Sequence, residues 1–129
     1  MKDLKIGIRG EAVTEVDERN TAKTVGSGEL DVFATPMMTA LMEKAACNAI
    51  ETYLDDNETT VGTMLNITHD SATPKGMKVK AFAEVTAVNG REICFDVYAE
   101  DEKGRIGGGT HKRFMVYADR FMEKTNSKK

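Results

Sequence analysis

The sequence has little of several features that would indicate a specialised class of protein. Among its 129 residues are only two cysteines, Cys47 and Cys94, and neither belongs to a CxxC or Cys/His cluster. Each lies in an apolar run, so we expect two small buried hydrophobic residues in a reducing compartment, and no metal site. Internal repeats and low-complexity linkers are also absent. A chain of this length fits one domain, which we place at residues 1–129.

An excess of positive charge and long apolar runs are missing as well. The 18 basic and 21 acidic side chains leave a net charge of −3 without a basic stripe, which argues against nucleic acid as a partner. The opening residues MKDLKIGIRG lack the apolar segment of a signal peptide, and no run approaches the ~20 apolar residues of a membrane span. We therefore expect a cytoplasmic protein without a membrane partner. The closing residues KTNSKK are short and basic, and we expect a frayed end.

The clearest predicted element is a helix that begins at Pro36 and ends near Leu54. Thr35 is a preferred N-cap residue, and proline suits the first helical position because its missing N–H would have no partner there. Glu43 lies in this apolar segment on the flank of the helix, with no cation three or four residues away. Such a carboxylate is a candidate functional group. The alternatives are a surface position or an ion pair with a distant cation such as Arg113.

Alternating apolar and polar residues predict strands after the helix. The alternation over residues 61–69 would place a set of side chains on one face: Val61, Thr63, Leu65, Ile67 and His69. A second strand follows, and Asn89–Gly90 is a strong signal for a hairpin to the third. The residues DEKG form a second turn before the last strand, while residues 10–26 suggest one or two further strands. This order predicts an α+β fold with a meander of four antiparallel strands after the helix.

Three segments carry five short motifs in order: VFATPMMTALMEKAACNAI, TTVGTMLNITHDSATPKGMKV and IGGGTHKRFMV. The motifs are FAT at the start of the helix, a glutamate eight residues later, VGT, THxxATPxG and GxGTHxR. In these motifs the sequence resembles the hotdog thioesterase family that includes fluoroacetyl-CoA thioesterase. The resemblance covers residues 10–118 and leaves 119–129 as a basic tail. It implies the hotdog fold, in which a curved antiparallel sheet wraps a long central helix.

The resemblance also implies a function, that of an acyl-CoA thioesterase acting on a small or medium acyl-CoA. The catalytic Thr, Glu and His of the family correspond to Thr35, Glu43 and His69. Its glycine at the substrate carbonyl corresponds to Gly62, and the arginine of its last strand to Arg113, both as substrate-binding residues. The family's site lies at a dimer interface where two sheets join edge to edge, which implies a homodimer and leaves tetramers open. No cofactor is expected, since coenzyme A enters as part of the substrate.

Thioester hydrolysis needs a nucleophile, a base that activates it and donors for the developing oxyanion. Glu43 would serve as base or carboxylate nucleophile, His69 as a proton shuttle near neutral pH, and a backbone N–H at Gly62 as oxyanion donor. Two departures from the family concern selectivity. Pro36 follows the threonine where fluoroacetyl-CoA thioesterase has glycine, and VGSGELDV is short and polar where that enzyme has an aromatic lid. We therefore do not expect selectivity for a fluorinated acyl group.

Two other functions are compatible with these residues. One is a non-catalytic acyl-CoA-binding hotdog module, which would bind the thioester without turnover. The other is a hotdog enoyl-CoA hydratase, although that pattern pairs Asp with His where this helix offers Thr and Glu. His111 alternates onto the same face as Arg113, and we interpret it as a structural or rim residue.

Overall fold

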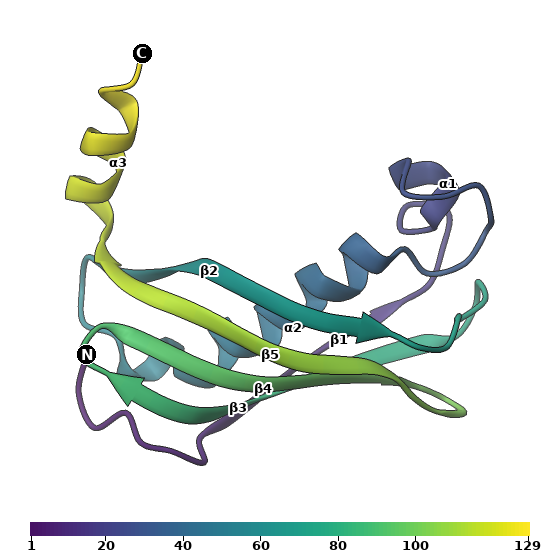
Figure 1. Cartoon of the computed structure of the whole chain (residues 1–129), viewed down its shortest axis with the longest axis horizontal. Coiled ribbons are helices and arrows are strands. Elements are labelled where there is room, and N and C mark those ends of the chain that lie inside the picture. Colours follow the sequence, from purple (N-terminus) through teal and green to yellow (C-terminus); the bar gives the residue numbers. More distant parts are fainter.

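A five-stranded antiparallel sheet curves around one long helix in the computed structural model, which describes all 129 residues (Figure 1). The elements in chain order are β1 (Arg9–Glu15), α1 (Ala22–Val25), α2 (Thr35–Ile50), the 3-10 turn η1 (Glu51–Tyr53), β2 (Glu58–His69), β3 (Lys78–Asn89), β4 (Glu92–Asp101), β5 (Gly104–Tyr117) and α3 (Ala118–Asn126). The strand order across the sheet is β1-β3-β4-β5-β2. This is the expected α+β architecture of a sheet wrapped around a central helix.

The predicted meander of four strands is wrong at its first member. Strands β3, β4 and β5 are joined by tight hairpins, in which Asn89 pairs with Glu92 and Asp101 pairs with Gly104. Strand β2 instead pairs with β5 at the far edge of the sheet. The longer connection 70–77 carries the chain across to β3. Tight turns fix the neighbour of a strand and longer connections do not, so alternation predicted β2 without predicting its partner.

A β-bulge in β2 changes which of its residues face the helix. The pairing with β5 shifts register between Gly62 and Met64, where Thr63 is the extra residue. Gly62 on one side of the bulge and His69 on the other both face α2. The expectation that Val61 shares a face with His69 is therefore wrong. An inserted residue reverses the alternation, and the sequence pattern alone does not reveal it.

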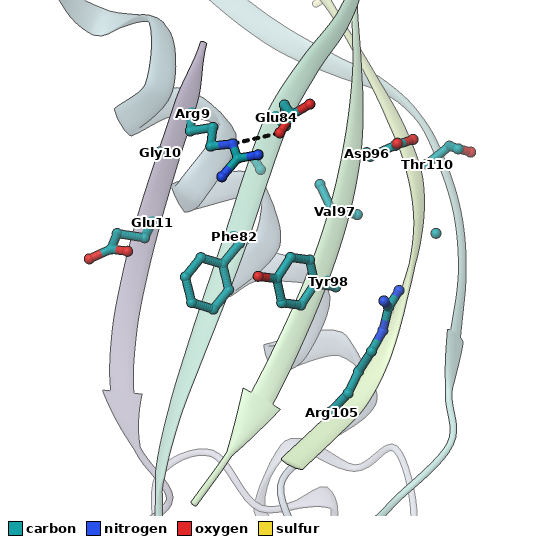
Figure 2. A pocket seen from close by; sticks show the side chains of 12 residues that line it. Arg9, Gly10, Glu11, Phe82, Glu84, Asp96, Val97, Tyr98, Arg105 and Thr110 are labelled. Atoms are coloured by element: carbon teal, nitrogen blue, oxygen red, sulfur yellow. Dashed lines mark hydrogen bonds and ion pairs between the residues drawn. The ribbon is translucent and has the colours of Figure 1, made fainter. Parts of the chain in front are cut away.

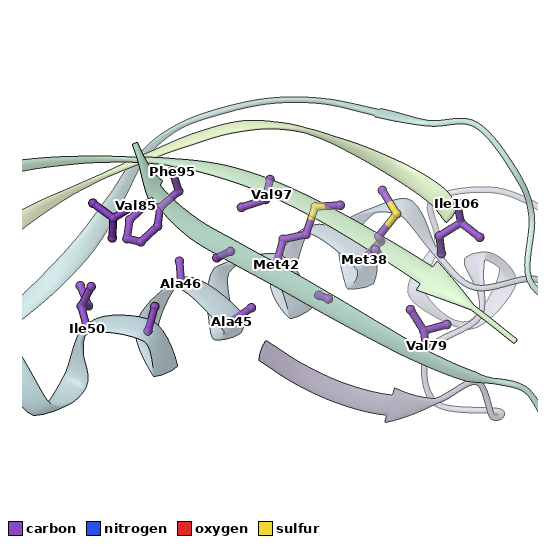
Figure 3. Packing of buried hydrophobic residues seen from close by; sticks show 14 of the residues in the cluster. Met38, Met42, Ala45, Ala46, Ile50, Val79, Val85, Phe95, Val97 and Ile106 are labelled. Atoms are coloured by element: carbon purple, nitrogen blue, oxygen red, sulfur yellow. The ribbon is translucent and has the colours of Figure 1, made fainter. Parts of the chain in front are cut away.

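The helix packs small and methionine side chains against the sheet (Figure 3). The buried residues of α2 are Met38, Met42, Ala45, Ala46, Ala49 and Ile50. The face of β3 predicted to be apolar is buried: Val79, Ala81, Ala83 and Val85. At Gly10 of β1, an added Cβ would lie 2.4 Å from the backbone oxygen of Ala45 and the backbone nitrogen of Ala49. Glycine is therefore required where β1 crosses the helix at close range.

Helix α2 begins one residue earlier than expected. Its N-cap is Ala34, and Thr35 is the first helical residue, without a capping hydrogen bond. The N-cap role predicted for Thr35 is therefore wrong. Pro36 still lies in the first turn, where backbone N–H groups have no helical partner. The helix continues through η1 to Tyr53, close to the predicted end.

Two smaller expectations are also not met. Helix α3 includes the first half of the KTNSKK segment that we expected to fray, and it projects away from the sheet (Figure 1). Cys47 and Cys94 are free thiols that are only half-buried. Residues 10–26, where we expected one or two strands, contain one strand, β1, followed by the short helix α1. None of the helices has the length and apolar character that crossing a membrane requires.

Candidate functional site

Thr35 and His69 meet in the fold although 34 residues separate them. Thr35 Oγ1, in the first turn of α2, lies 2.7 Å from His69 Nδ1, at the end of β2. Because Ala34 is the N-cap, the hydroxyl of Thr35 is not engaged by the helix backbone and can bond to the imidazole. A hydroxyl within hydrogen-bond distance of an imidazole is an arrangement in which histidine activates a nucleophile or relays a proton.

The environment of His69 favours the neutral ring. Burial lowers the pKa of His69 below its ordinary value, and the charge of Asp70 and the nearby backbone of Ser71 oppose this effect only in part. The second ring nitrogen, Nε2, is buried and has no hydrogen-bond partner. Since buried polar atoms nearly always have a partner, this nitrogen marks a place where a further group can bind.

A cavity of about 210 Å³ opens beside the pair, and both Thr35 and His69 line it. Its walls combine the apolar side chain of Phe33 with the hydroxyls of Ser27 and Ser71. One water molecule occupies about 30 Å³ in the liquid, so the space holds several waters or a small organic group. The histidine–threonine pair therefore lies at a site that a small ligand can enter.

Glu43 does not join Thr35 and His69 within one chain. It lies eight residues after Thr35 on the same helix, which at ~1.5 Å per residue corresponds to about 12 Å along the axis. Its Oε2 accepts a hydrogen bond from Arg113 Nη1 at 3.0 Å, so the ion pair with Arg113, which the sequence left open as an alternative, is present. The side chain of Glu43 is 36% exposed. Helical spacing missed the pair because Arg113 belongs to β5, 70 residues later.

Arg113 is the centre of a buried polar network, and its side chain is only 7% exposed. Its Nε donates to Thr60 Oγ1 at 2.8 Å, and its Nη2 donates to the Thr60 carbonyl at 3.0 Å. Its Nη1 donates to Glu43 and also lies 3.2 Å from His111 Nε2. Most N–H groups of the guanidinium are therefore engaged, and the orientation of Glu43 follows from that of Arg113.

Gly62 lies directly against this network. An added Cβ at this position would be 2.4 Å from Glu43 Oε2 and 3.3 Å from Arg113 Nη1. The missing side chain therefore leaves room on β2 for the carboxylate. Of the five site residues expected from the sequence, the structure brings Gly62, Glu43 and Arg113 into one cluster. The other two, Thr35 and His69, form a second.

His111 is the residue whose importance the sequence did not reveal. It is fully buried, with an exposed fraction of 0%, and not at a rim. Its Nδ1 lies 2.8 Å from the Met64 carbonyl, and its Nε2 faces Arg113. Burial lowers the pKa of His111, assisted by the charge of Arg113, while the hydrogen bond to Met64 and the charge of Glu43 raise it. Alternation correctly placed it on the face of Arg113, but the bulge that supplies the Met64 carbonyl left no signal in the sequence.

A larger cavity of about 750 Å³ lies on the opposite face of the sheet and contains none of these residues (Figure 2). Phe82 and Tyr98 stack there with ring centroids 4.6 Å apart, and the Arg105 guanidinium lies 5.0 Å from the Tyr98 ring centre. Arg9 donates to Glu84 at 2.6 Å. The residues that line this cavity include no histidine or cysteine, and no hydroxyl among them makes a hydrogen bond to a carboxylate. We therefore place the candidate site on the helix side of the sheet.

Comparisons with known proteins agree with this fold and with the motifs. The model of a family described as fluoroacetyl-CoA-specific thioesterase matches residues 16–119. Fluoroacetyl-CoA thioesterase from Streptantibioticus cattleyicolor is 40% identical over 98 residues, 76% of this chain and 70% of that protein. A mutant fluoroacetyl-CoA-specific thioesterase, solved with fluoroacetate and CoA, is 33% identical with a TM-score of 0.86, covering 92% of this chain and 99% of that chain. A hot-dog-like protein from Thermanaerovibrio acidaminovorans, 20% identical over 97% of this chain and 93% of that chain, has a TM-score of 0.87. The predicted hotdog fold is thereby confirmed.

Proposed function

The chain belongs to the fluoroacetyl-CoA-specific thioesterase family and is a thioester hydrolase, and we propose that it hydrolyses a small or medium acyl-CoA with Thr35, Glu43 and His69. The observation that carries the proposal is the 2.7 Å contact between Thr35 Oγ1 and His69 Nδ1. This contact places a hydroxyl and a neutral imidazole beside a small cavity. Gly62 and Arg113 are proposed as the residues that contact the substrate beside the carboxylate of Glu43.

In the proposed mechanism, Thr35 and His69 move a proton. The neutral ring of His69 gives its Nε2 proton to the sulfur of the departing coenzyme A and takes up the hydroxyl proton of Thr35 at Nδ1. Thr35 then regains a proton from solvent, to which Glu43 returns the proton that it takes from the attacking water. Coenzyme A thiolate is a fair leaving group, so this assistance need not be strong. Glu43, oriented by Arg113, accepts a proton from the attacking water as general base, and a backbone N–H at Gly62 stabilises the oxyanion. Attack by the carboxylate itself is the alternative, and a covalent acyl–Glu43 species detected by mass spectrometry would select it.

We propose that two copies of the chain complete the site, because Glu43 and the Thr35–His69 pair are about two helical turns apart in one copy. Strand β2 is an edge of the sheet, and an unpaired edge is a template for another strand. Antiparallel pairing of two β2 strands about a two-fold axis would bring His69 toward the Gly62 half of the partner's strand. In each copy, the carboxylate of Glu43 extends from α2 and lies against Gly62 in that half of β2.

Mixing two inactive variants tests this shared site. Chains carrying Glu43→Gln are combined with chains carrying His69→Ala under conditions that exchange subunits. If each site takes its glutamate and histidine from different copies, half of the dimers are mixed and each has one intact site. Since a wild-type dimer has two intact sites, the expected recovery is roughly a quarter of wild-type activity. No recovery, with mixed dimers confirmed by native mass spectrometry, contradicts the shared site.

The acyl group is proposed to be small, since the cavity beside Thr35 and His69 measures about 210 Å³. The segment VGSGELDV beside it is polar, which supports acceptance of acyl groups without fluorine. A panel of acyl-CoA thioesters, including acetyl- and fluoroacetyl-CoA, is followed with a thiol reagent. Tight binding without turnover would select the binding module. Loss of the enoyl absorbance of crotonyl-CoA would select the hydratase.

A further inference from the structure

The network around Arg113 contains a buried histidine that the proposed mechanism does not use. We propose that His111 is a positioning residue, a neutral ring that fixes the guanidinium of Arg113 and, through it, the carboxylate of Glu43. The geometry rests on contacts within this chain. The catalytic consequence rests on the proposed function of Glu43.

The two contacts of the His111 ring allow only one protonation state. Its Nδ1 lies 2.8 Å from the Met64 carbonyl, which only accepts hydrogen bonds, so Nδ1 carries the proton. Its Nε2 lies 3.2 Å from Arg113 Nη1, which only donates, so Nε2 is unprotonated and accepts. A charged ring would direct an N–H at the guanidinium and break this contact.

The surroundings of His111 hold the ring in this orientation. Phe95 of β4 stacks against it, with ring centroids 5.8 Å apart and an interplanar angle of 25°. The bulge in β2 supplies the Met64 carbonyl. The charged groups that act on the ring are Arg113 on the same strand and Glu43 on α2, with opposite effects on its pKa, while burial favours the neutral form.

Arg113 transmits this orientation to Glu43 through a single nitrogen. One N–H of Nη1 is directed at His111 and the other at Glu43, while Nε and Nη2 are tied to Thr60. Without an acceptor at His111, one buried N–H would lose its partner, and the guanidinium would turn to recover one. The carboxylate would move with it. A displacement of about 1 Å in a catalytic group costs up to ~100-fold in rate.

Three substitutions separate positioning from packing. His111→Phe keeps a ring against Phe95 and removes both nitrogens, while His111→Gln keeps an acceptor that can reach Arg113. Thr110→Val is the matched control, because Thr110 is the adjacent residue on the exposed face of the sheet. We expect His111→Phe to lower kcat roughly tenfold with KM within about twofold, His111→Gln to recover most of kcat, and the control to equal wild type.

A measurement on the ring itself keeps the inference testable without turnover. Nitrogen-15 NMR of wild-type His111 is expected to show the Nδ1–H tautomer, neutral at pH 7. The carboxyl carbon-13 shift of Glu43 is expected to change in His111→Phe and to stay near wild type in His111→Gln. If the wild type hydrolyses no acyl-CoA, the proposed function fails while these spectra still decide the positioning role. An Nε2–H tautomer, a charged ring at pH 7, or wild-type kcat in folded His111→Phe overturns the inference.

Discussion

Replacing Gly62 by alanine is the smallest change that displaces the carboxylate of Glu43. The added Cβ would lie 2.4 Å from Glu43 Oε2, whereas ordinary van der Waals contact begins at 3.4 Å, so the oxygen must retreat by about 1.0 Å. A retreat away from Arg113 stretches the 3.0 Å hydrogen bond beyond its useful range. We expect kcat to fall by roughly 10- to 100-fold.

Stability should respond much less than activity to this change. The φ of Gly62 is not in the left-handed region, so alanine fits the backbone, and Gly→Ala then stabilises by ~0.4–1 kcal/mol through the unfolded chain. The atom that must move is the end of a flexible side chain, which limits the opposing cost. The free energy of unfolding in urea is therefore expected to stay within about 1 kcal/mol of wild type.

A double-mutant cycle shows whether the loss of rate passes through Glu43. Gly62→Ala, Glu43→Gln and the double variant are compared in kcat by thiol release at saturating acyl-CoA. If alanine acts by displacing the carboxylate, it adds little to the loss caused by Glu43→Gln. Wild-type kcat in Gly62→Ala would contradict displacement of the carboxylate, and so would two losses that multiply fully in the double variant.

Four further perturbations test other parts of the structure. Gly10→Ala is expected to lower the unfolding free energy by about 1–3 kcal/mol in urea titrations, since its Cβ would meet backbone atoms of α2; an unchanged midpoint contradicts that packing. Thr35→Val removes the hydrogen bond to His69 and is expected to lower kcat at least ~tenfold with little change in Tm. A Thr35→Val variant with wild-type kcat would contradict the role of this hydroxyl. His69 and His111 have lowered pKa values in the fold, so the unfolded chain binds more protons than the folded chain below about pH 6.5. The free energy of unfolding that these two residues contribute is therefore complete above that pH and decreases as the pH falls. A urea midpoint that stays constant between pH 7 and 5 would contradict this expectation. Leu65→Arg, on the exposed edge strand, is expected to give monomers in light scattering together with lost turnover, and an active monomer would contradict the shared site.

The sequence could predict the elements that depend on local spacing. The apolar spacing of α2, the alternation of β3 and the turns of both hairpins are local, and all of them are present in the structure. The position of β2 depends on pairing across the whole sheet, which no local pattern encodes. The bulge at Thr63 is also invisible in the sequence, since an inserted residue leaves no recognisable mark in the residue pattern of the strand.

The candidate site could be predicted only in part for the same reason. The resemblance predicts that Thr35 and His69 belong to one site. In the structure Ala34 is the N-cap of the helix, so the hydroxyl of Thr35 is free to bond to His69. The ion pair between Glu43 and Arg113 joins elements 70 residues apart. The spacing of residues within the helix does not reveal this pair and leaves Arg113 as one alternative among others. Long-range pairs of this kind become visible only when the strands are in register.

Thiol release from the acyl-CoA panel by the wild-type protein is the most direct test of the central claim. We expect turnover of at least one small or medium acyl-CoA, with kcat at least ~tenfold lower in Glu43→Gln and in His69→Ala. Folded wild-type protein that releases no thiol above background from any thioester would contradict the account.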